Sequence, residues 1–159
     1  MSIPAVGEPA PTFTLPGMIV RDGVRTDDEY DLSSEIGRTI VLAFYPGDAT
    51  PVCTAQLCSY QEELDDFDDL GAVVWGISPQ ALDSHEAFAR DSSLTFPLLS
   101  DTAGTVIRDY GVRAPGLGLR RSVFVVGPDG VVRWRHIGLV GLRFPKASVI
   151  RGEIEQLVR

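Results

Sequence analysis

The chain has 159 residues, of which 44% are hydrophobic and 23% charged, and its formal net charge is −8. This length and composition are typical of one globular domain, residues 1–159, with enough apolar side chains to bury a core. The acidic balance argues against nucleic acid as a main partner, because phosphate binding needs a basic surface. No window is long and apolar enough to span a membrane, and the N-terminus does not resemble a signal peptide, so we expect a cytoplasmic location.

The first part of the chain is rich in Pro, Gly and Asp, which predicts irregular chain and a short hairpin that turns at Asp22–Gly23. After it, hydrophobic patterning and cap residues predict alternating strands and helices. The predicted elements are a helical turn at 31–38, a strand at 38–46, a helix at 50–71, a strand at 72–78, a helix that begins with proline at 79–92, an extended segment at 96–101, a short helix at 102–111, a hairpin at 122–138 and a helix at 145–159.

This order of elements predicts the fold class. Continuous apolar strands that alternate with helices indicate an α/β protein whose sheet is covered on both faces. A βαβ beginning followed by a ββα end is the thioredoxin arrangement. We therefore expect a thioredoxin-like fold, with a central mixed β-sheet flanked by helices and an N-terminal hairpin extension. The inner face of the last helix is predicted to consist of Val149, Ile150, Ile154, Leu157 and Val158.

Both cysteines of the chain fall in the stretch FYPGDATPVCTAQLC, residues 44–58, and Cys53 lies in the first turn of the predicted helix. There the unpaired backbone N–H groups and the positive end of the helix dipole favour an anion, so the position favours a nucleophilic thiolate. Pro46 and Pro51 stiffen the loop that leads into the helix, and Thr50, the predicted N-cap, puts a hydroxyl group beside the sulfur. Position alone leaves two interpretations open, a reactive thiolate or a buried structural thiol.

Pro46, Thr50 and Cys53 form the pattern P-x-x-x-T-x-x-C, which resembles the active-site motif of the peroxiredoxins. The longer stretch resembles the Q-type peroxiredoxins, also called the bacterioferritin comigratory protein group. The segments GISPQALDSHEAFAR, LTFPLLSDTAGTVIRDYGV and RSVFVVGPDGVVR are similar to that group in kind and order. The resemblance implies a thiol-dependent peroxidase that reduces hydrogen peroxide and organic hydroperoxides without a cofactor or a metal.

The resemblance also implies roles for single residues. Cys53 would be the peroxidatic cysteine, whose thiolate attacks one peroxide oxygen and becomes a sulfenic acid. The Thr50 hydroxyl, the Cys53 backbone N–H and an arginine would stabilise the charge that develops on the oxygens. In the family this arginine precedes the strand that matches RSVFVV, which selects Arg121 and leaves Arg120 as the alternative, because successive strand side chains face opposite ways. Gln56 stands where many relatives have a glutamate, which leaves the fine-tuning of Arg121 open.

Cys58 is, by the same resemblance, the resolving cysteine, which forms an intramolecular disulfide with Cys53 that a thioredoxin- or glutaredoxin-type reductant reduces. In an intact α-helix, residues five apart have Cα atoms separated by roughly 8.6 Å, whereas a disulfide needs less than about 7 Å. The first turns of the helix must therefore unwind before the bond forms. The alternative is a helix-buried Cys58, with an external thiol as the resolving group. The oligomeric state is left open between a monomer and a weak homodimer.

Two rival functions stay open. A thioredoxin-type thiol–disulfide oxidoreductase would share the fold, but that activity usually depends on C-x-x-C, and this chain has C-x-x-x-x-C. A redox sensor or holdase would use the same reactive cysteine to signal. A zinc site is disfavoured, because His85 and His136 lie far from the cysteines without ligand spacing. Ser84 and His85 are expected to have a surface or capping role, and His136 a structural one.

Overall fold

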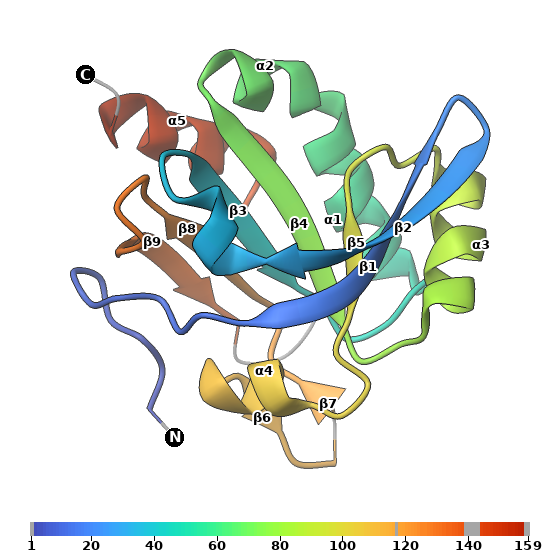
Figure 1. Cartoon of the computed structure of the whole chain (residues 1–159), viewed down its shortest axis with the longest axis horizontal. Coiled ribbons are helices and arrows are strands. Elements are labelled where there is room, and N and C mark those ends of the chain that lie inside the picture. Colours follow the sequence, from blue (N-terminus) through green and yellow to red (C-terminus); the bar gives the residue numbers. More distant parts are fainter. Residues whose placement is uncertain (1, 117, 139–143, 158–159) are drawn as a thin grey trace.

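A mixed β-sheet of seven strands forms the centre of the computed structural model, which describes residues 2–116, 118–138 and 144–157 (Figure 1). Its strand order is β2-β1-β5-β4-β3-β8-β9. β3, β4 and β5 are parallel to one another, whereas β1 and β8 lie antiparallel to their neighbours on both sides. The strands are β1 Thr14–Arg21, β2 Val24–Asp31, β3 Thr39–Phe44, β4 Ala72–Ser78, β5 Leu98–Ser100, β8 Ser122–Val126 and β9 Val132–Ile137, and a separate ribbon pairs β6 Arg113–Ala114 with β7 Gly118–Leu119.

Helices flank this sheet. The mixed sheet and its flanking helices confirm the predicted fold class, an α/β protein with a thioredoxin-like fold. They are the 3₁₀ turn η1 Leu32–Glu35 and the α-helices α1 Pro51–Glu62, α2 Leu64–Asp69, α3 Leu82–Ser92, α4 Thr105–Asp109 and α5 Ala147–Leu157. In Figure 1, α1, α2 and α5 lie behind the sheet, and α4 lies at the edge where β5 ends. None of the helices in the described part of the chain is both long and apolar enough to cross a membrane.

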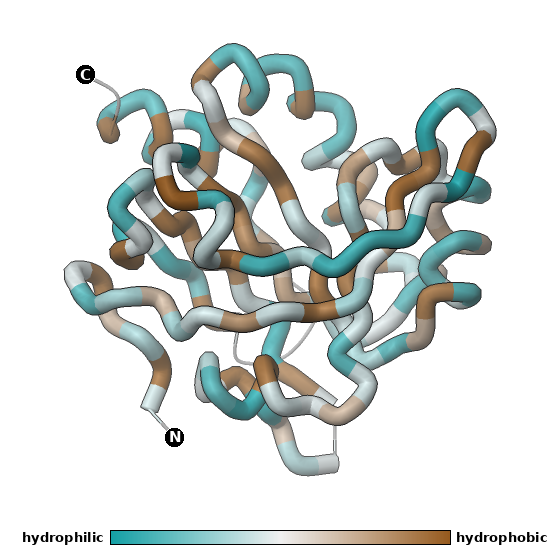
Figure 2. The backbone as a smooth tube through the Cα atoms, viewed as in Figure 1, coloured by the Kyte–Doolittle hydropathy of each residue, from teal (hydrophilic) through white to brown (hydrophobic). Residues whose placement is uncertain are grey.

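The sheet has a hydrophobic core on each face, because successive side chains of a strand point to opposite sides. The central strands carry most of the hydrophobic residues and β2 is mainly hydrophilic (Figure 2). From β3, Val41 and Ala43 join one core, which contains Cys53 and side chains of α1, α2, α3 and α5. Leu42 and Phe44 join the other core, which lies under α4 and the N-terminal segment. Cys53 therefore lies on the face of the sheet that α1, α2, α3 and α5 cover.

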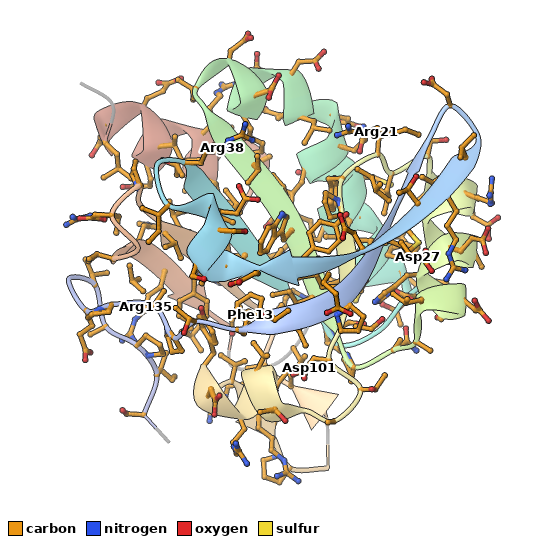
Figure 3. All side chains as sticks on the ribbon, in the orientation of Figure 1. Phe13, Arg21, Asp27, Arg38, Asp101 and Arg135 are labelled. Carbon is orange, nitrogen blue, oxygen red and sulfur yellow. The ribbon has the colours of Figure 1, made fainter. Side chains whose placement is uncertain are left out.

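Aromatic rings and one buried carboxylate organise the second core. Phe13, labelled in Figure 3, packs against this core. Its ring meets those of Trp75 and Tyr110 edge to face, with ring centroids 6.3 Å and 6.0 Å away. Asp101, which follows β5, is 2% exposed, and its Oδ2 atom accepts a hydrogen bond of 2.8 Å from the backbone N–H of Ile107. This bond satisfies a free N–H of α4 and fixes that helix at the end of β5.

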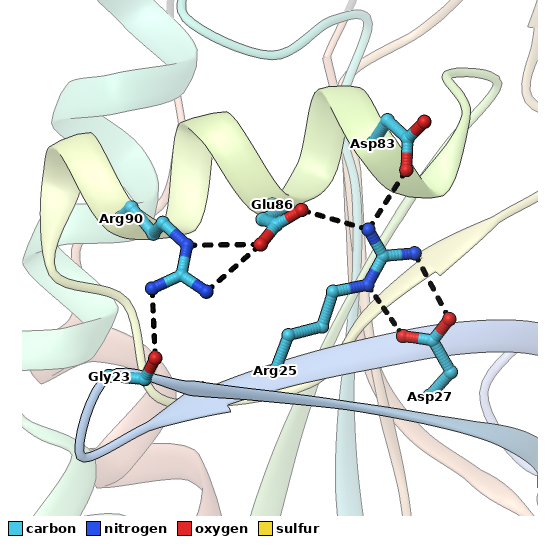
Figure 4. A network of polar contacts seen from close by, with 6 residues as sticks. All are labelled: Gly23, Arg25, Asp27, Asp83, Glu86 and Arg90. Atoms are coloured by element: carbon cyan, nitrogen blue, oxygen red, sulfur yellow. Dashed lines mark hydrogen bonds and ion pairs between the residues drawn. The ribbon is translucent and has the colours of Figure 1, made fainter.

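The N-terminal hairpin is pinned to α3 by charged side chains. The hairpin turns at Asp22–Gly23, as predicted, and both residues have positive φ, as a type I′ hairpin turn requires. Arg25 in β2 binds Asp27 in the same strand and reaches Asp83 and Glu86 in α3 with N–O distances of 2.9 Å (Figure 4). The hairpin is thus tied to α3, the helix that also contacts the loop at residues 45–50 between β3 and α1, called the cysteine loop below.

Two predicted helix boundaries and part of one predicted buried face are wrong. The helix predicted at 50–71 is broken at Glu63, whose φ of −103° and ψ of 11° separate α1 from α2. The helix predicted from Pro79 begins at Leu82, because residues 79–81 form the bend that leads out of β4. In α5, Ile150 and Ile154 are buried as predicted, but the exposed fractions of Val149 and Leu157 are 49% and 39%. Val158, predicted for the same face, lies outside the described residues.

Candidate active site

Cys53 lies in the first turn of α1, directly after the loop that leaves β3. Thr50 is the N-cap residue, with extended backbone angles, and Pro51 follows as the first helical residue, both as predicted. The Thr50 hydroxyl accepts a hydrogen bond of 3.4 Å from the backbone N–H of Cys53 and lies 3.3 Å from the Gly47 carbonyl, to which it donates. The predicted motif thus sets the start of α1, with Pro46 at the head of the loop.

Arg121 is the arginine that meets this sulfur. Its Nη2 atom donates to the Sγ atom of Cys53 at 3.2 Å, and both residues are buried, with exposed fractions of 2% and 0%. Arg120, the alternative, is exposed. The structure therefore brings Arg121, Cys53 and Thr50 together in one site. A cationic donor beside a thiol at a helix N-terminus is the environment that favours a thiolate.

Gln56 holds the other side of the Arg121 guanidinium. Its Oε1 atom accepts a hydrogen bond of 2.7 Å from Nη1, and its Nε2 atom donates to the Tyr60 hydroxyl at 2.9 Å. That hydroxyl donates in turn to the Pro145 carbonyl at 3.2 Å. Burial raises the pKa of Tyr60, so its hydroxyl keeps its proton across the physiological range. A neutral amide therefore orients the arginine here, without adding a negative charge beside the sulfur.

Cys58 lies five residues further along α1, about one and a half turns, and is half-buried. Its Sγ atom is 3.9 Å from the Ser92 carbonyl, at the end of α3. Both cysteines are free thiols, and α1 is continuous from Pro51 to Glu62, so they belong to one intact helix. The structure describes the reduced form of this cysteine pair.

Two buried residues of the site were missed by sequence reasoning. Asp48, inside the cysteine loop, pairs with His85 of α3, whose side chain is fully buried. The expected surface or capping role of His85 is therefore wrong. The reason is that His85 lies on the same face of α3 as Phe88, three residues on, and so points into the core. A lone acidic residue between Pro46 and Pro51 was the available signal for Asp48.

Among residues 2–116, 118–138 and 144–157, no cluster of three or more His, Cys, Asp or Glu side chains is arranged to hold a metal ion. A cavity of about 400 Å³ lies between α2, β4 and the hairpin, lined in part by Arg21, Tyr30 and Trp75. None of residues 46–58 lines it, so it is separate from the cysteine site.

Comparisons of the sequence and of the structure with known proteins point to the same family. The sequence profile of the AhpC/TSA family matches residues 6–135. The chain is 35% identical over 136 residues to the putative peroxiredoxin bcp of Coxiella burnetii, covering 80% of this chain and 84% of that protein. It is 35% identical over 144 residues to the peroxiredoxin Bcp of Xanthomonas campestris pv. campestris, covering 84% and 86%. The solved structure of Xanthomonas campestris peroxiredoxin Q superposes with a TM-score of 0.76 at 27% identity, covering 91% and 92% of the two chains.

Proposed function

This chain belongs to the AhpC/TSA family and is a thiol-dependent peroxidase of the peroxiredoxin type, and we propose that Cys53 is its peroxidatic residue. The Cys53 thiolate attacks one oxygen of the peroxide, an S–O bond forms and the O–O bond breaks. The other oxygen leaves as hydroxide or alkoxide and takes up a proton, while the sulfur becomes a sulfenic acid. The observation that carries this assignment is the 3.2 Å contact between Arg121 and the buried Sγ atom.

Thr50, Arg121 and Pro46 support this step. Negative charge moves from the sulfur across both oxygens, so fixed donors lower the barrier most when they already surround that path. Arg121 supplies a guanidinium that Gln56 holds in place. Thr50 supplies a hydroxyl whose proton turns from the Gly47 carbonyl to a bound peroxide oxygen. Pro46 fixes its own φ angle at the point where the chain leaves β3 and enters the cysteine loop.

Cys58 resolves the sulfenic acid in this proposal. Its thiol attacks the sulfur of Cys53, an S–S bond forms, the S–O bond breaks and the oxygen leaves as water. Relative to the two thiols, the cysteine pair has then lost two electrons, which the peroxide took up in the first step. Because an intact α1 keeps the two Cα atoms too far apart for a disulfide, the first turns of the helix unwind for this step. The thiol of Cys58 is only half-buried, which makes it accessible to an approaching Cys53.

A dithiol reductant of the thioredoxin or glutaredoxin type then regenerates both thiols by thiol–disulfide exchange. Hydrogen peroxide and organic hydroperoxides are the proposed substrates, since the attack needs only an O–O bond and a leaving oxygen. The cytoplasmic location and the monomeric or weakly dimeric state stay predictions.

Single-turnover oxidation of the reduced protein tests this proposal. Fluorescence of Trp75 and Trp134 follows the reaction, and mass spectrometry identifies the product. We expect fast oxidation to be lost in Cys53→Ser. The mass of the wild type should fall by that of two hydrogen atoms, and Cys58→Ser should give a sulfenic or over-oxidised product. If Cys53 reacts no faster than a free thiol, the assignment is wrong. Insulin reduction without peroxide turnover would instead indicate a thioredoxin-type oxidoreductase.

A further inference from the structure

Asp48 is a nearly buried carboxylate inside the loop that precedes Cys53. Its side chain is 3% exposed, and its two oxygens accept hydrogen bonds of 2.7 Å from the hydroxyls of Tyr45 and Ser84. The Oδ2 atom also lies 2.7 Å from Nδ1 of His85. A buried carboxylate is stable only when it is paired and hydrogen-bonded, so these contacts restrict where this part of the loop can lie.

His85 connects Asp48 to the central sheet. Its Nε2 atom lies 3.0 Å from the carbonyl oxygen of Leu99 in β5. A carbonyl only accepts, so Nε2 carries a proton, and a second proton lies between Nδ1 and the Asp48 carboxylate. The pair thus holds two protons in total and is electrically neutral as a unit, which suits its burial. Through it the cysteine loop is fixed to α3 and to β5 at the same time.

Ala49, the residue after Asp48, has an unusual backbone conformation. Its φ of 61° lies in the left-handed region, which disfavours a residue with a Cβ atom. Ala49 is exposed, so its own side chain does not hold this conformation. Asp48 on one side and the Thr50 cap on the other are the fixed points between which the chain is bent. The backbone N–H of Asp48 is held as well, by a hydrogen bond to Oε1 of Gln80.

From these contacts we propose that the Asp48–His85 pair is a positioning unit for the peroxidatic cysteine. It holds Ala49 in the left-handed conformation, and this places Thr50 and the first turn of α1 so that the Cys53 sulfur meets Arg121. The inference rests on the proposed role of Cys53. Asp48 and His85 do not touch the reacting atoms, and they act on the rate through the loop.

The second-order rate constant for oxidation by hydrogen peroxide, measured by stopped-flow fluorescence beside the melting temperature, tests this role. We expect Asp48→Ala to slow oxidation by about tenfold to a hundredfold, the usual effect of misplacing a reacting group by an ångström. Asp48→Asn should stay within about threefold of the wild type, because the amide can accept from Tyr45 and donate to a neutral His85. Adding Ala49→Gly to Asp48→Ala should recover a large part of the rate, since glycine adopts the left-handed conformation without strain.

Two controls separate positioning from stability and from the proposed function. Ile154→Ala, in the core under α5, should lower the melting temperature and leave the oxidation rate within about twofold. If Asp48→Ala does not fold, the milder His85→Gln is expected to show the same slowing. Its amide group can reach only one of the two acceptors of His85, the Asp48 carboxylate and the Leu99 carbonyl. The inference is overturned if Asp48→Ala and His85→Gln oxidise at the wild-type rate, or if Ala49→Gly gives no recovery, while Cys53→Ser still abolishes oxidation. Fast oxidation that survives Cys53→Ser overturns the proposed function instead.

Discussion

The Nη2 atom of Arg121 lies 3.2 Å from the Sγ atom of Cys53, although 68 positions separate the two residues in the chain. Strand pairing produces this contact. Ser122, the first residue of β8, pairs with Phe44, the last residue of β3, and the cysteine loop begins directly after Phe44. The register between two buried strands therefore brings the guanidinium to the start of α1. Gln56, one turn beyond Cys53, then fixes its orientation.

Arg121→Lys is predicted to slow oxidation by peroxide by about a hundredfold, the effect seen when one preorganised donor to a developing charge is removed. A lysine keeps the positive charge but has one nitrogen, so it cannot contact Gln56 and Cys53 at once in the way that the guanidinium fork does. Stopped-flow fluorescence of the reduced variants gives the rate constant. Arg120→Lys, one residue away and exposed, is the matched control and should change the rate less than twofold. Equal slowing in both variants would contradict the specific role given to the Arg121 guanidinium.

Sequence reasoning reached the parts of the site that local chemistry determines. Thr50 and Pro51 are a helix start by their residue types, and Cys53 follows at the position where a thiolate is favoured. Arg121 was selected by resemblance, and the contact with the sulfur depends on the pairing of β3 with β8. That pairing is a non-local property, which periodicity alone does not give.

The remaining features depend on tertiary packing. His85 is buried because Asp48, from a distant loop, provides its partner, and a histidine on a helix does not reveal this. The break at Glu63 has no Gly or Pro to mark it. It allows Phe67 of α2 to enter the same core as Leu57 of α1. Propensity is a weak guide where such long-range contacts decide the outcome.

Tyr60→Phe is predicted to lower the free energy of unfolding by about 1–3 kcal/mol, because it leaves one buried and one partly buried polar group without their hydrogen-bond partner. These groups are the Gln56 amide and the Pro145 carbonyl, which the Tyr60 hydroxyl joins. Urea denaturation of the reduced protein measures the change. Tyr30→Phe is the control, since no hydrogen bond of the Tyr30 hydroxyl occurs within the described parts of the chain. A loss of the same size in both variants would contradict the role given to this hydroxyl.

The ion-pair cluster of Arg25 with Asp27, Asp83 and Glu86, here called the Arg25 cluster, predicts that the stability of the protein depends on pH. A hydrogen bond from Arg25 lowers the pKa of Asp27, and hydrogen bonds from Arg90 and Arg25 lower the pKa of Glu86. A pKa that is lower in the folded state means that the contribution to stability is present above the ordinary values near 4, and is lost as the pH falls through the folded values. Arg25→Gln should therefore destabilise the protein at pH 7 and matter progressively less toward about pH 3.

Urea denaturation of the wild type and Arg25→Gln at several pH values measures this difference. The effect should be small and should shrink further at high salt, because these side chains are partly or largely exposed. Arg38→Gln, an exposed arginine outside the cluster, is the control, and its difference from the wild type should not vary with pH in this range. A constant difference for Arg25→Gln between pH 7 and pH 3 would argue against the assigned pKa shifts.

Oxidation is predicted to unwind α1 only as far as Gln61. The Gln61 side chain donates to the Thr95 hydroxyl and accepts from the Thr95 backbone N–H, both at 2.8 Å, and so ties this end of the helix to the segment before β5. Cys53 has no such anchor in the folded helix beyond the Thr50 cap and the Arg121 contact, both of which are lost when its sulfur moves toward Cys58.

Amide hydrogen exchange of the fully disulfide-bonded protein, with circular dichroism beside it, measures this boundary. Exchange should accelerate by at least about tenfold over residues 51–58 and change little after Gln61, since opened helix loses its protection and anchored helix keeps it. Oxidised Cys58→Ser cannot form the bond and should keep the protection of the reduced wild type. The anchor itself is tested by Gln61→Ala, in which the accelerated region should spread toward α2. If exchange and helicity are unchanged in the disulfide form, Cys58 resolves the sulfenic acid by a route other than local unwinding.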